Sequence, residues 1–328
     1  MDSLLASIAG RILSGCGAPL LSASEALAVA HLPADATLDL LAVASLARAV
    51  YKPAATFTCG IINAKSGRCP ENCAFCAQSA HYTTNTPVYG LVDTATLLAR
   101  AQELAAAGVA RFGIVTSGTT PSEADIDALC EAATVILATV DIKLCASLGL
   151  LTSERALRLR QAGFTSYHHN LETAGSHFAR VCTTHAYEDD LETVRVARAA
   201  GFRVCSCGIF GLGESWAQRI ELAQTLTALK VDSLPLNFLN PIAGTPLENA
   251  NLLPPEEALR VVALFRLLHP TQDVLICGGR EKTFGDWQSW VLSAGANGIM
   301  TGNYLTTKGY DFSADNALLK TLGLRVAP

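Results

Sequence analysis

The sequence predicts an α/β fold, a (βα)8 barrel of the TIM type with a helical N-terminal extension. Eight short apolar runs recur along the chain, and Ala/Leu-rich stretches with helical spacing lie between them. An Ala-Gly pair ends four of these helices just before a strand. Eight strands that alternate with helices indicate a closed parallel barrel, whose active site lies at the carboxyl ends of the strands.

The predicted strands follow one another at regular spacing, near residues 55–61, 111–117, 141–148, 166–172, 203–210, 233–239, 273–279 and 298–302. Intervening stretches such as "DTATLLARAQELAAAG" and "EEALRVVALFRLL" have helical periodicity. Glycines 108, 163, 201 and 295 supply the left-handed residue that closes a helix. We therefore expect a helical extension over residues 1–50, the barrel over 51–312, and a C-terminal helix and tail over 313–328.

Composition narrows the class of protein. Half of the 328 residues are apolar and 16% are charged, which fits a well-buried enzyme. A net charge of −5 without a Lys/Arg-rich run argues against a nucleic-acid partner. The stretch "ILSGCGAPLLSAS" is too short to span a bilayer, so we expect no membrane segment and a cytoplasmic location. Eleven cysteines in a reducing compartment point to metal or sulfur chemistry.

Three of these cysteines stand close together in "KSGRCPENCAFCAQSAHY". Cys69, Cys73 and Cys76 follow the first predicted strand, so they lie in the first βα loop at the mouth of the active site. A structural zinc ion prefers four protein ligands, and no second ligand pair follows at a suitable spacing. A 4Fe–4S cluster takes one ligand per iron, so three thiolates leave one iron open for a small molecule.

This spacing, at this place in a (βα)8 chain, resembles the radical S-adenosylmethionine superfamily. Phe75 stands where that superfamily has an aromatic residue beside the adenine. The resemblance implies that the open iron chelates the amino and carboxylate groups of S-adenosylmethionine. It also implies that one electron from the cluster cleaves this cofactor to methionine and a 5′-deoxyadenosyl radical.

Further motifs resemble the biotin synthase family, in order and from about residue 55 to residue 323. They are "SGRCPENCAFCAQS", "YHHNLET" (167–173), "RVCSCGIFGLGE" (203–214), "LPLNFLNPIAGTPL" (234–247), "GGREKTF" and "AGANGIMTGNYLTT" (294–307). The resemblance implies that Asn170 and Glu172 hold the ribose of S-adenosylmethionine and that Asn237 contacts dethiobiotin.

Two histidines depart from the family pattern. His185 stands where the family has an arginine near the S-adenosylmethionine carboxylate, and His168 stands where an asparagine is usual. We place His185 among the cofactor contacts and His168 among the substrate contacts. Histidine can donate to a carboxylate, but its charge depends on its surroundings.

Sulfur insertion needs a sulfur donor, which in this family is an auxiliary 2Fe–2S cluster held by three cysteines and an arginine. Two of the four ligands are replaced here, by Gly113 on strand two and Leu275 on strand seven, whereas Cys145 and Cys205 match. The residues suggest a substitute, because cysteines occupy the four odd-numbered strands at positions 59, 145, 205, 207 and 277. Alternate strands of such a barrel contribute side chains to one interior layer.

We therefore hypothesise a larger auxiliary cluster of the 4Fe type rather than 2Fe–2S, carrying an extra sulfide. Cys145 and Cys205 are its first ligands, Cys277 follows, and either Cys59 or Cys207 completes the set. Cys205 and Cys207 lie two residues apart, so strand alternation places them on the same side. The alternative is that each is a small buried hydrophobe, which is how we interpret Cys16, Cys130 and Cys182.

Together these features predict a radical enzyme that converts dethiobiotin to biotin. The 5′-deoxyadenosyl radical would take hydrogen from the C9 methyl, and the carbon radical would capture a cluster sulfide. Cleavage of a second S-adenosylmethionine would activate C6 and close the ring. The resemblance implies a flavodoxin or ferredoxin as electron donor and a homodimer. Clusters with an open iron are oxygen-labile, so we expect an anaerobic setting. The alternatives are another enzyme of the same superfamily, such as a cofactor maturase or mutase, and a non-catalytic iron–sulfur scaffold.

Overall fold

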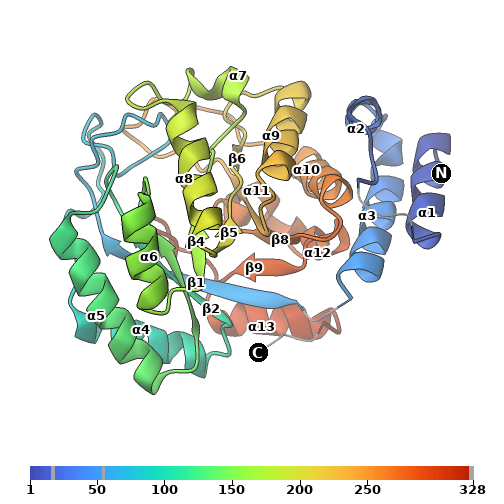
Figure 1. Cartoon of the computed structure of the whole chain (residues 1–328). Coiled ribbons are helices and arrows are strands. Elements are labelled where there is room, and N and C mark those ends of the chain that lie inside the picture. The colour runs from blue at the N-terminus through green and yellow to red at the C-terminus, as the bar shows by residue number, and fades with distance from the viewer. Residues whose placement is uncertain (16–18, 54–55, 325–328) are drawn as a thin grey trace.

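The computed structural model describes residues 1–15, 19–53 and 56–324 and contains a closed parallel barrel (Figure 1). Its strands are β1 (Phe57–Lys65), β2 (Arg111–Thr116), β3 (Lys143–Ser147), β4 (Ser166–His168), β5 (Arg203–Cys205), β6 (Ile209–Phe210), β7 (Ser233–Phe238), β8 (Asp273–Ile276) and β9 (Gly298–Met300). They are ordered β5-β4-β3-β2-β1-β9-β8-β7-β6, and a β5–β7 pairing closes the ring. The predicted (βα)8 barrel is confirmed.

The fifth barrel position differs from the expected single strand over 203–210. The structure divides it into β5 and β6, because residues 206–208 leave the regular ladder. The Ser206 amide donates to the Ser233 carbonyl, whereas the Cys207 amide donates to the side-chain oxygen of Asn170. The fourth strand likewise ends at His168 instead of residue 172. Both irregular segments lie at the active-site end of the barrel.

Helices cover the outside of the barrel (Figure 1). They are α4 (Thr94–Ala106), α5 (Glu123–Thr139), α6 (Ser153–Gln161), α7 (Gly175–Phe178), α8 (Tyr187–Ala199), α9 (Trp216–Ala228), α10 (Pro255–Leu268), α11 (Arg280–Phe284), α12 (Trp290–Ser293) and α13 (Phe312–Thr321), with a 3-10 turn η2 (Gly285–Trp287). Ser122 and Ser215 begin α5 and α9 as N-caps within capping boxes. The four predicted closing glycines all have positive φ, as their position after a helix requires.

The N-terminal segment forms α1 (Ser3–Leu13), α2 (Ala23–Ala30), a 3-10 turn η1 (Ala34–Ala36) and α3 (Thr37–Tyr51). Figure 1 shows these helices beside α10 and α12. Thr37 donates to Glu256 at 2.7 Å, and Arg260 donates to the carbonyls of Ala30 and Leu32, which joins the segment to α10. No single helix in the described residues is both long enough and apolar enough to cross a membrane.

A fully buried arginine joins α10 to the base of the barrel. Arg266 donates to the Gly295 carbonyl at 2.7 Å, to the Gln272 carbonyl at 2.8 Å and to Asn297 Oδ1 at 2.7 Å. Gly295 has φ +104°, and a Cβ on it would lie 2.6 Å from Arg266 Cγ. A glycine is therefore required where this arginine crosses the closing turn.

We predict that Arg266→Met lowers the free energy of unfolding by about 3 kcal/mol, because it leaves several buried acceptors without a donor. Urea unfolding of the metal-free chain, followed by circular dichroism, measures the loss. Arg155→Met, which removes an ion pair to the exposed Glu123, serves as the control and should cost less than about 1 kcal/mol. Equal losses in both variants would contradict the role given to the Arg266 hydrogen bonds.

Candidate active site

A cavity of about 450 Å³ occupies the barrel interior. It is lined by strand side chains and by the loops that follow their carboxyl ends. At the loop end it contacts all three cysteines of the Cys-x3-Cys-x2-Cys loop, and deeper in the barrel it contacts Cys59, Cys145, Cys205 and Cys277. One continuous space therefore joins the two sets of thiols that the sequence singled out.

The first cysteine set lies in the loop between β1 and α4, which backbone hydrogen bonds hold in place. The Cys69 amide donates to the Gln78 carbonyl at 3.0 Å, and the Cys76 amide donates to the Cys73 carbonyl at 2.9 Å. The Ala74 amide donates at 2.8 Å to the carbonyl of Val181, which anchors the loop to the segment before α8. The chain thus presents three thiols to the cavity from a fixed backbone.

The three loop thiols suit a multi-iron cluster better than a single ion. Four thiolates around one zinc lie about 4 Å apart. Among the described residues, only Glu71, Cys182 and His185 bring three ligand atoms within 4.8 Å of one another, and the three loop thiols do not. A cluster whose irons each take one thiolate spreads the sulfur atoms farther apart. Burial raises the pKa of Cys69, Cys73 and Cys76, to about 11 for Cys76, so these thiolates need a cationic partner.

The predicted ribose pair lies on the irregular segment after β4. Asn170 Nδ2 approaches Glu172 Oε2 at 3.5 Å, and both residues line the cavity together with Phe75. Burial, followed by the charge of Asp190, raises the pKa of Glu172 to about 8. At neutral pH this carboxyl is therefore protonated and can both donate and accept, which matches a pair of vicinal hydroxyls.

Glu172 reaches this position through strained backbone. Its φ of +60° is unusual for a residue other than glycine. Its carbonyl accepts from the Ile209 amide at 2.8 Å, and a Cβ on Gly208 would lie 2.4 Å from that carbonyl oxygen. Gly208 is thus required for the backbone contact that fixes Glu172. Strain of this kind is typical of functional sites.

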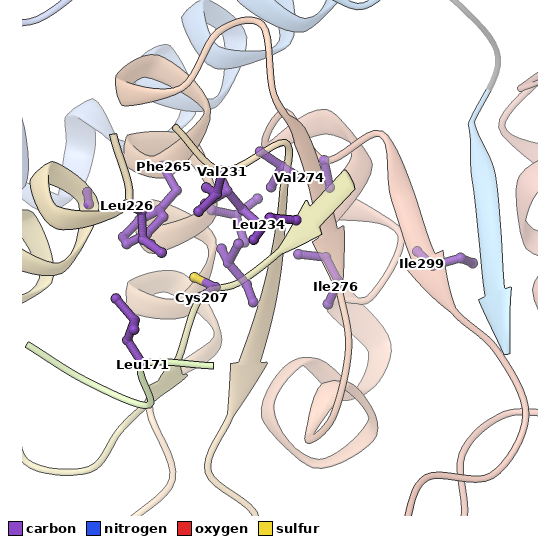
Figure 2. Packing of buried hydrophobic residues seen from close by; sticks show 14 of the residues in the cluster. Leu171, Cys207, Leu226, Val231, Leu234, Phe265, Val274, Ile276 and Ile299 are labelled. Atoms are coloured by element: carbon purple, nitrogen blue, oxygen red, sulfur yellow. The ribbon is translucent and has the colours of Figure 1, made fainter. Parts of the chain in front are cut away.

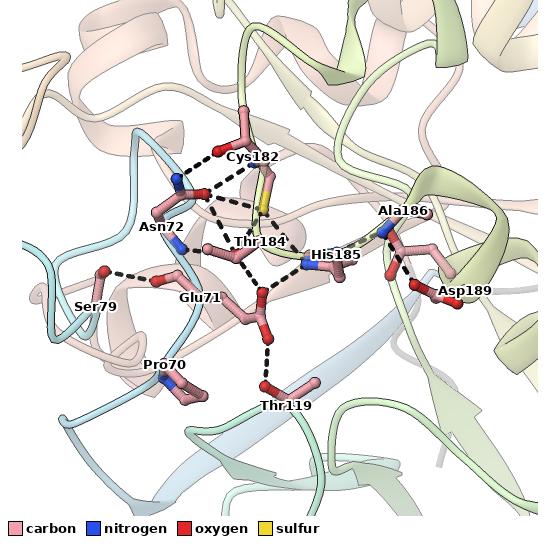
Figure 3. Close-up of polar contacts among 12 residues, drawn as sticks. Pro70, Glu71, Asn72, Ser79, Thr119, Cys182, Thr184, His185, Ala186 and Asp189 are labelled. Atoms are coloured by element: carbon pink, nitrogen blue, oxygen red, sulfur yellow. Dashed lines mark hydrogen bonds and ion pairs between the residues drawn. The ribbon is translucent and has the colours of Figure 1, made fainter.

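His185 belongs to a charged network beside the cysteine loop (Figure 3). Its Nδ1 lies 2.8 Å from Glu71 Oε2, its Nε2 lies 3.3 Å from Asp190 Oδ2, and Asp190 Oδ1 lies 2.8 Å from His169 Nε2. Glu71 also accepts hydrogen bonds from Thr119 and Thr184. The hydrogen bond to Asp190 is the main cause that raises the pKa of His185 to about 10. His185 is consequently a cation at neutral pH.

Cys182 is part of the same network, so its interpretation as an ordinary apolar residue is wrong. Its sulfur lies 3.3 Å from His185 Nδ1 and 3.4 Å from both Asn72 Oδ1 and Thr184 Oγ1 (Figure 3). The contacts with Asn72 join residues 110 positions apart, and no local pattern in the sequence signals them. Cys130 is half-buried on α5, and Cys16 lies outside the described residues.

His168 lies deeper in the cavity than His185 and has the opposite electrostatic character. Its Nδ1 lies 3.0 Å from the Ser147 hydroxyl. Burial, aided by the neighbouring His169, lowers the pKa of His168 to about 4. The ring is therefore neutral at physiological pH and offers one donor and one acceptor.

Asn237 lies on β7 and lines the cavity, but its amide also supports backbone. Nδ2 donates to the Pro235 carbonyl at 3.1 Å, and Oδ1 accepts from the Gly278 amide at 3.0 Å. This bonding matches the turn-supporting role that any asparagine can have. Because a carbonyl oxygen has two lone pairs, Oδ1 retains one for a ligand.

Four deep cysteines surround the inner part of the cavity from β1, β3, β5 and the segment after β8. Burial raises the pKa of Cys59 to about 12 and of Cys205 to about 11. The pKa values of Cys145 and Cys277 are also raised, first by burial and then by the nearby thiols of Cys205 and Cys59. Four soft donors that line one part of an interior cavity fit an iron–sulfur cluster better than a single ion, because a cluster spreads its ligands farther apart.

Cys207 does not belong to this group, and the expectation that it faces the same side as Cys205 is wrong. It lies in the apolar layer behind the strands, among Leu171, Leu226 and Leu234 (Figure 2). The alternation fails because β5 ends at Cys205. The structure thus separates the two candidates that the sequence left open, since Cys59 lines the cavity and Cys207 does not.

Gly113 and Leu275 stand at the two positions where the family resemblance implies cluster ligands, and both lie among apolar neighbours. Gly113 pairs with Cys145 across β2 and β3, and a Cβ on it would already lie 3.0 Å from Ile61 Cγ2. Leu275 packs in a small apolar cluster with Phe57 and Cys277. Neither position can supply a metal ligand, so the deep site differs from one built on three cysteines and an arginine.

Family models match two consecutive parts of the chain. Residues 64–226 match the radical SAM superfamily, and residues 235–325 match the Biotin and Thiamin Synthesis associated domain. The chain is 57% identical over 305 residues to a biotin synthase from Nitratidesulfovibrio vulgaris strain DP4, covering 93% of this chain and 84% of the relative. It is 50% identical over 327 residues to a biotin synthase from Geobacter metallireducens strain GS-15, covering 99% and 98%.

Solved structures with a similar backbone include a methylornithine synthase, with a TM-score of 0.83, 19% identity and 98% coverage of both chains. A second is the FeFe-hydrogenase maturase from Carboxydothermus hydrogenoformans, with a TM-score of 0.82, 16% identity and coverage of 98% of this chain and 79% of the maturase. At these identities the likeness shows the fold alone.

The two cavity histidines should titrate at opposite ends of the pH range. We predict that His185 stays doubly protonated up to a pH near 10 and that His168 stays neutral down to a pH near 4. Nitrogen-15 NMR of histidine-labelled, metal-free protein measures both, and His185→Gln and His168→Asn assign the signals. Loss of the His185 proton near the ordinary value of about 6.5 would contradict the network.

The same shift predicts how stability depends on pH. The pKa of His185 is higher in the folded than in the unfolded chain, so its stabilising contribution is complete below about pH 6.5 and is lost as pH rises toward about 10. Urea unfolding between these limits should show a smaller decline for His185→Gln than for the unsubstituted chain. Identical declines would show that His185 does not contribute to it.

Proposed function

The chain belongs to the biotin synthase family of radical S-adenosylmethionine enzymes, and we propose that its barrel holds two iron–sulfur clusters at opposite ends of one cavity. The enzyme inserts sulfur into dethiobiotin to form biotin. The observation that carries the proposal is the continuous cavity, with three loop cysteines at one end and four strand cysteines at the other.

Cys69, Cys73 and Cys76 would hold the first cluster, a 4Fe–4S cluster with one open iron. When bound and reduced, this cluster supplies the electron that cleaves S-adenosylmethionine into methionine and a 5′-deoxyadenosyl radical. The surrounding chain holds the cysteine loop rigid through the Ala74–Val181 backbone bond. The loop borders the cavity, so the bound cofactor would also contact the side chains that line it.

Three groups would orient S-adenosylmethionine. The His185 cation would attract the carboxylate, which is the task of an arginine in the related sequences. Asn170 and protonated Glu172 would share hydrogen bonds with the ribose, and Phe75 would pack against the adenine. Support comes from their joint presence on the cavity wall and from the pKa values of His185, about 10, and Glu172, about 8.

Dethiobiotin would lie between the cofactor and the deep cysteines. His168 faces this part of the cavity as a neutral ring and can donate or accept without attracting a counterion. Asn237 Oδ1, with its second lone pair, would accept an N–H of the cyclic urea. The C9 methyl and C6 must both come close to the radical and to the sulfur donor, which requires the substrate to lie along the axis of the cavity.

Cys59, Cys145, Cys205 and Cys277 would hold the auxiliary cluster that donates sulfur. We propose a 4Fe type, with an additional sulfide, because four thiols converge and the strand-seven arginine needed for the usual 2Fe–2S site is Leu275. Within this set Cys145 and Cys205 match the ligands that the family resemblance implies. Of the two candidates for the fourth ligand, Cys59 and Cys207, we choose Cys59 because it lines the cavity. A non-catalytic scaffold would have no use for the Asn170–Glu172 pair.

We further propose a reducing cytoplasmic setting, a flavodoxin or ferredoxin as electron donor, and a homodimer. The ten cysteines in the described part of the chain are all free thiols, which fits a reducing compartment. The donor and the dimer rest on the family resemblance. Clusters with an open iron are sensitive to oxygen, so we expect the enzyme to work under anaerobic conditions.

We expect protein reconstituted with iron and sulfide to form biotin and 5′-deoxyadenosine together. Anaerobic incubation with reductant, S-adenosylmethionine and dethiobiotin, read by mass spectrometry, measures both products. Deoxyadenosine without biotin would favour another radical S-adenosylmethionine enzyme. Neither product, from protein with intact clusters, would favour the scaffold.

The cysteine assignment predicts which alanine variants lose the auxiliary cluster and which keep it. Cys145→Ala, Cys205→Ala, Cys59→Ala and Cys277→Ala should each lower the iron content from about eight toward about four atoms per chain and abolish biotin formation, because a 4Fe cluster loses a ligand. Deoxyadenosine formation should persist, since the loop cluster is untouched. Cys207→Ala is the matched control and should keep both iron and activity. Full iron in Cys59→Ala together with loss in Cys207→Ala would reverse the assignment.

A further inference from the structure

A group of charged residues lies below the deep cysteines, at the amino-terminal end of the barrel. Arg111, Arg203 and Asp273 are the first residues of β2, β5 and β8, so the barrel brings them to one level. Both arginines line the cavity, and neither has a role in the functional assignments above. The sequence offers no local signal for this cluster, because its members lie between 70 and 162 residues from one another across their contacts.

Asp273 holds the cluster together. It accepts from Arg203 at 2.5 Å, from Arg111 at 3.4 Å and from Lys52 at 2.8 Å, and Asn297 donates to its other side at 2.9 Å. Hydrogen bonds and charges of these partners lower the pKa of Asp273 although burial raises it. Three cations thus surround one carboxylate, and two positive charges remain without an acidic partner in this cluster.

Both arginines are held beside the cavity that the deep thiols line. The Arg111 guanidinium lies 4.2 Å from the centre of the Phe57 ring, which fixes it against β1 opposite Cys59. Arg203 begins β5 two residues before Cys205, and both arginines line the same cavity as Cys59, Cys145 and Cys205. Arg203 Nε is buried without a hydrogen-bond partner.

The negative charge of the proposed auxiliary cluster requires compensating positive charge nearby. A 4Fe–4S core of charge +2 held by four thiolates carries a net charge of about −2, and each added sulfide makes it more negative. Burying such an anion is costly unless cations lie close by. The family resemblance implies an arginine on strand seven, where this chain has Leu275, so in this chain the compensating charge must come from elsewhere.

We propose that Arg111 and Arg203, oriented by Asp273, form a cationic floor that stabilises the anionic sulfur-donor cluster and sets its reduction potential. They are positioning residues, and the inference rests on the auxiliary cluster proposed above. Together with Lys52, which also pairs with Asp273, the floor has a net charge of +2, which favours the more negatively charged, reduced and sulfide-rich states of the cluster. The alternative is a purely structural role, in which Arg111, Arg203 and Asp273 only join the strand ends through ion pairs.

Charge-changing variants in opposite directions separate the two interpretations. Arg111→Met and Arg203→Met each remove one positive charge, and Asp273 keeps Lys52 and Asn297 as partners. Asp273→Asn removes the negative charge instead and leaves both arginines in place. Arg160→Met is the matched control, since Arg160 also stacks on a phenylalanine, Phe202, but lies outside the cavity.

The measurement is a dye-mediated redox titration of reconstituted holoenzyme, with the auxiliary cluster followed by EPR and total iron determined in the same samples. We expect the two Arg→Met variants to shift the auxiliary potential downward and to lose auxiliary iron, Asp273→Asn to shift it upward, and Arg111→Lys to restore the unsubstituted value. The potential of the loop cluster and the result for Arg160→Met should not change.

Three outcomes would overturn the proposal, and only one of them also removes the auxiliary cluster. Eight iron atoms per chain (about two 4Fe clusters) with the same potential in all variants would remove the cationic floor and leave the auxiliary cluster in place. Only about four iron atoms in the unsubstituted protein would remove the auxiliary cluster, and the floor with it. Shifts in the same direction for Arg→Met and Asp273→Asn would show a purely structural role.

Discussion

Burying several thiolates inside one barrel is the constraint on which the rest of this structure depends. A thiol ionises reluctantly in an apolar interior, and burial raises the pKa of every cysteine that lines the cavity. Metal ions can supply the missing positive charge, and so can fixed cations. The loop cysteines lie near the His185 cation, and the deep cysteines lie above Arg111 and Arg203, so each end of the cavity has its own cation.

The same constraint bears on our proposal that His185 takes the place that the family resemblance gives to an arginine. Histidine carries a charge near neutrality only when its surroundings favour it. Glu71 and Asp190 bind the two ring nitrogens, and together they keep His185 charged up to a pH near 10. His168, buried without an acidic partner, remains neutral. The two histidines therefore have different roles, although neither role follows from residue type alone.

Much of the fold and the loop site could be predicted from the sequence, because both depend on local patterns. Alternating strands and helices predicted the barrel, and the cysteine spacing predicted which thiols share a loop. Long-range contacts could not be predicted this way. Cys207 faces the core because β5 ends at Cys205, so strand alternation does not extend to it. Cys182 contacts Asn72, which lies 110 residues earlier in the chain. Arg111, Arg203 and Asp273 come together because three strands begin at the same level, and Lys52 joins them from the segment before β1.

The central claim is that the deep cysteines hold the sulfur that enters biotin, and a single-turnover isotope experiment tests it most directly. Protein reconstituted with sulfur-34 sulfide, freed of excess sulfide and then supplied with unlabelled sulfide in solution, would be given reductant, S-adenosylmethionine and dethiobiotin. Biotin carrying sulfur-34, lost in parallel from Cys145→Ala but not from Cys207→Ala, is the result that our account predicts. Biotin carrying only unlabelled sulfur would contradict it, because the sulfur would then come from solution instead of from a cluster in the barrel.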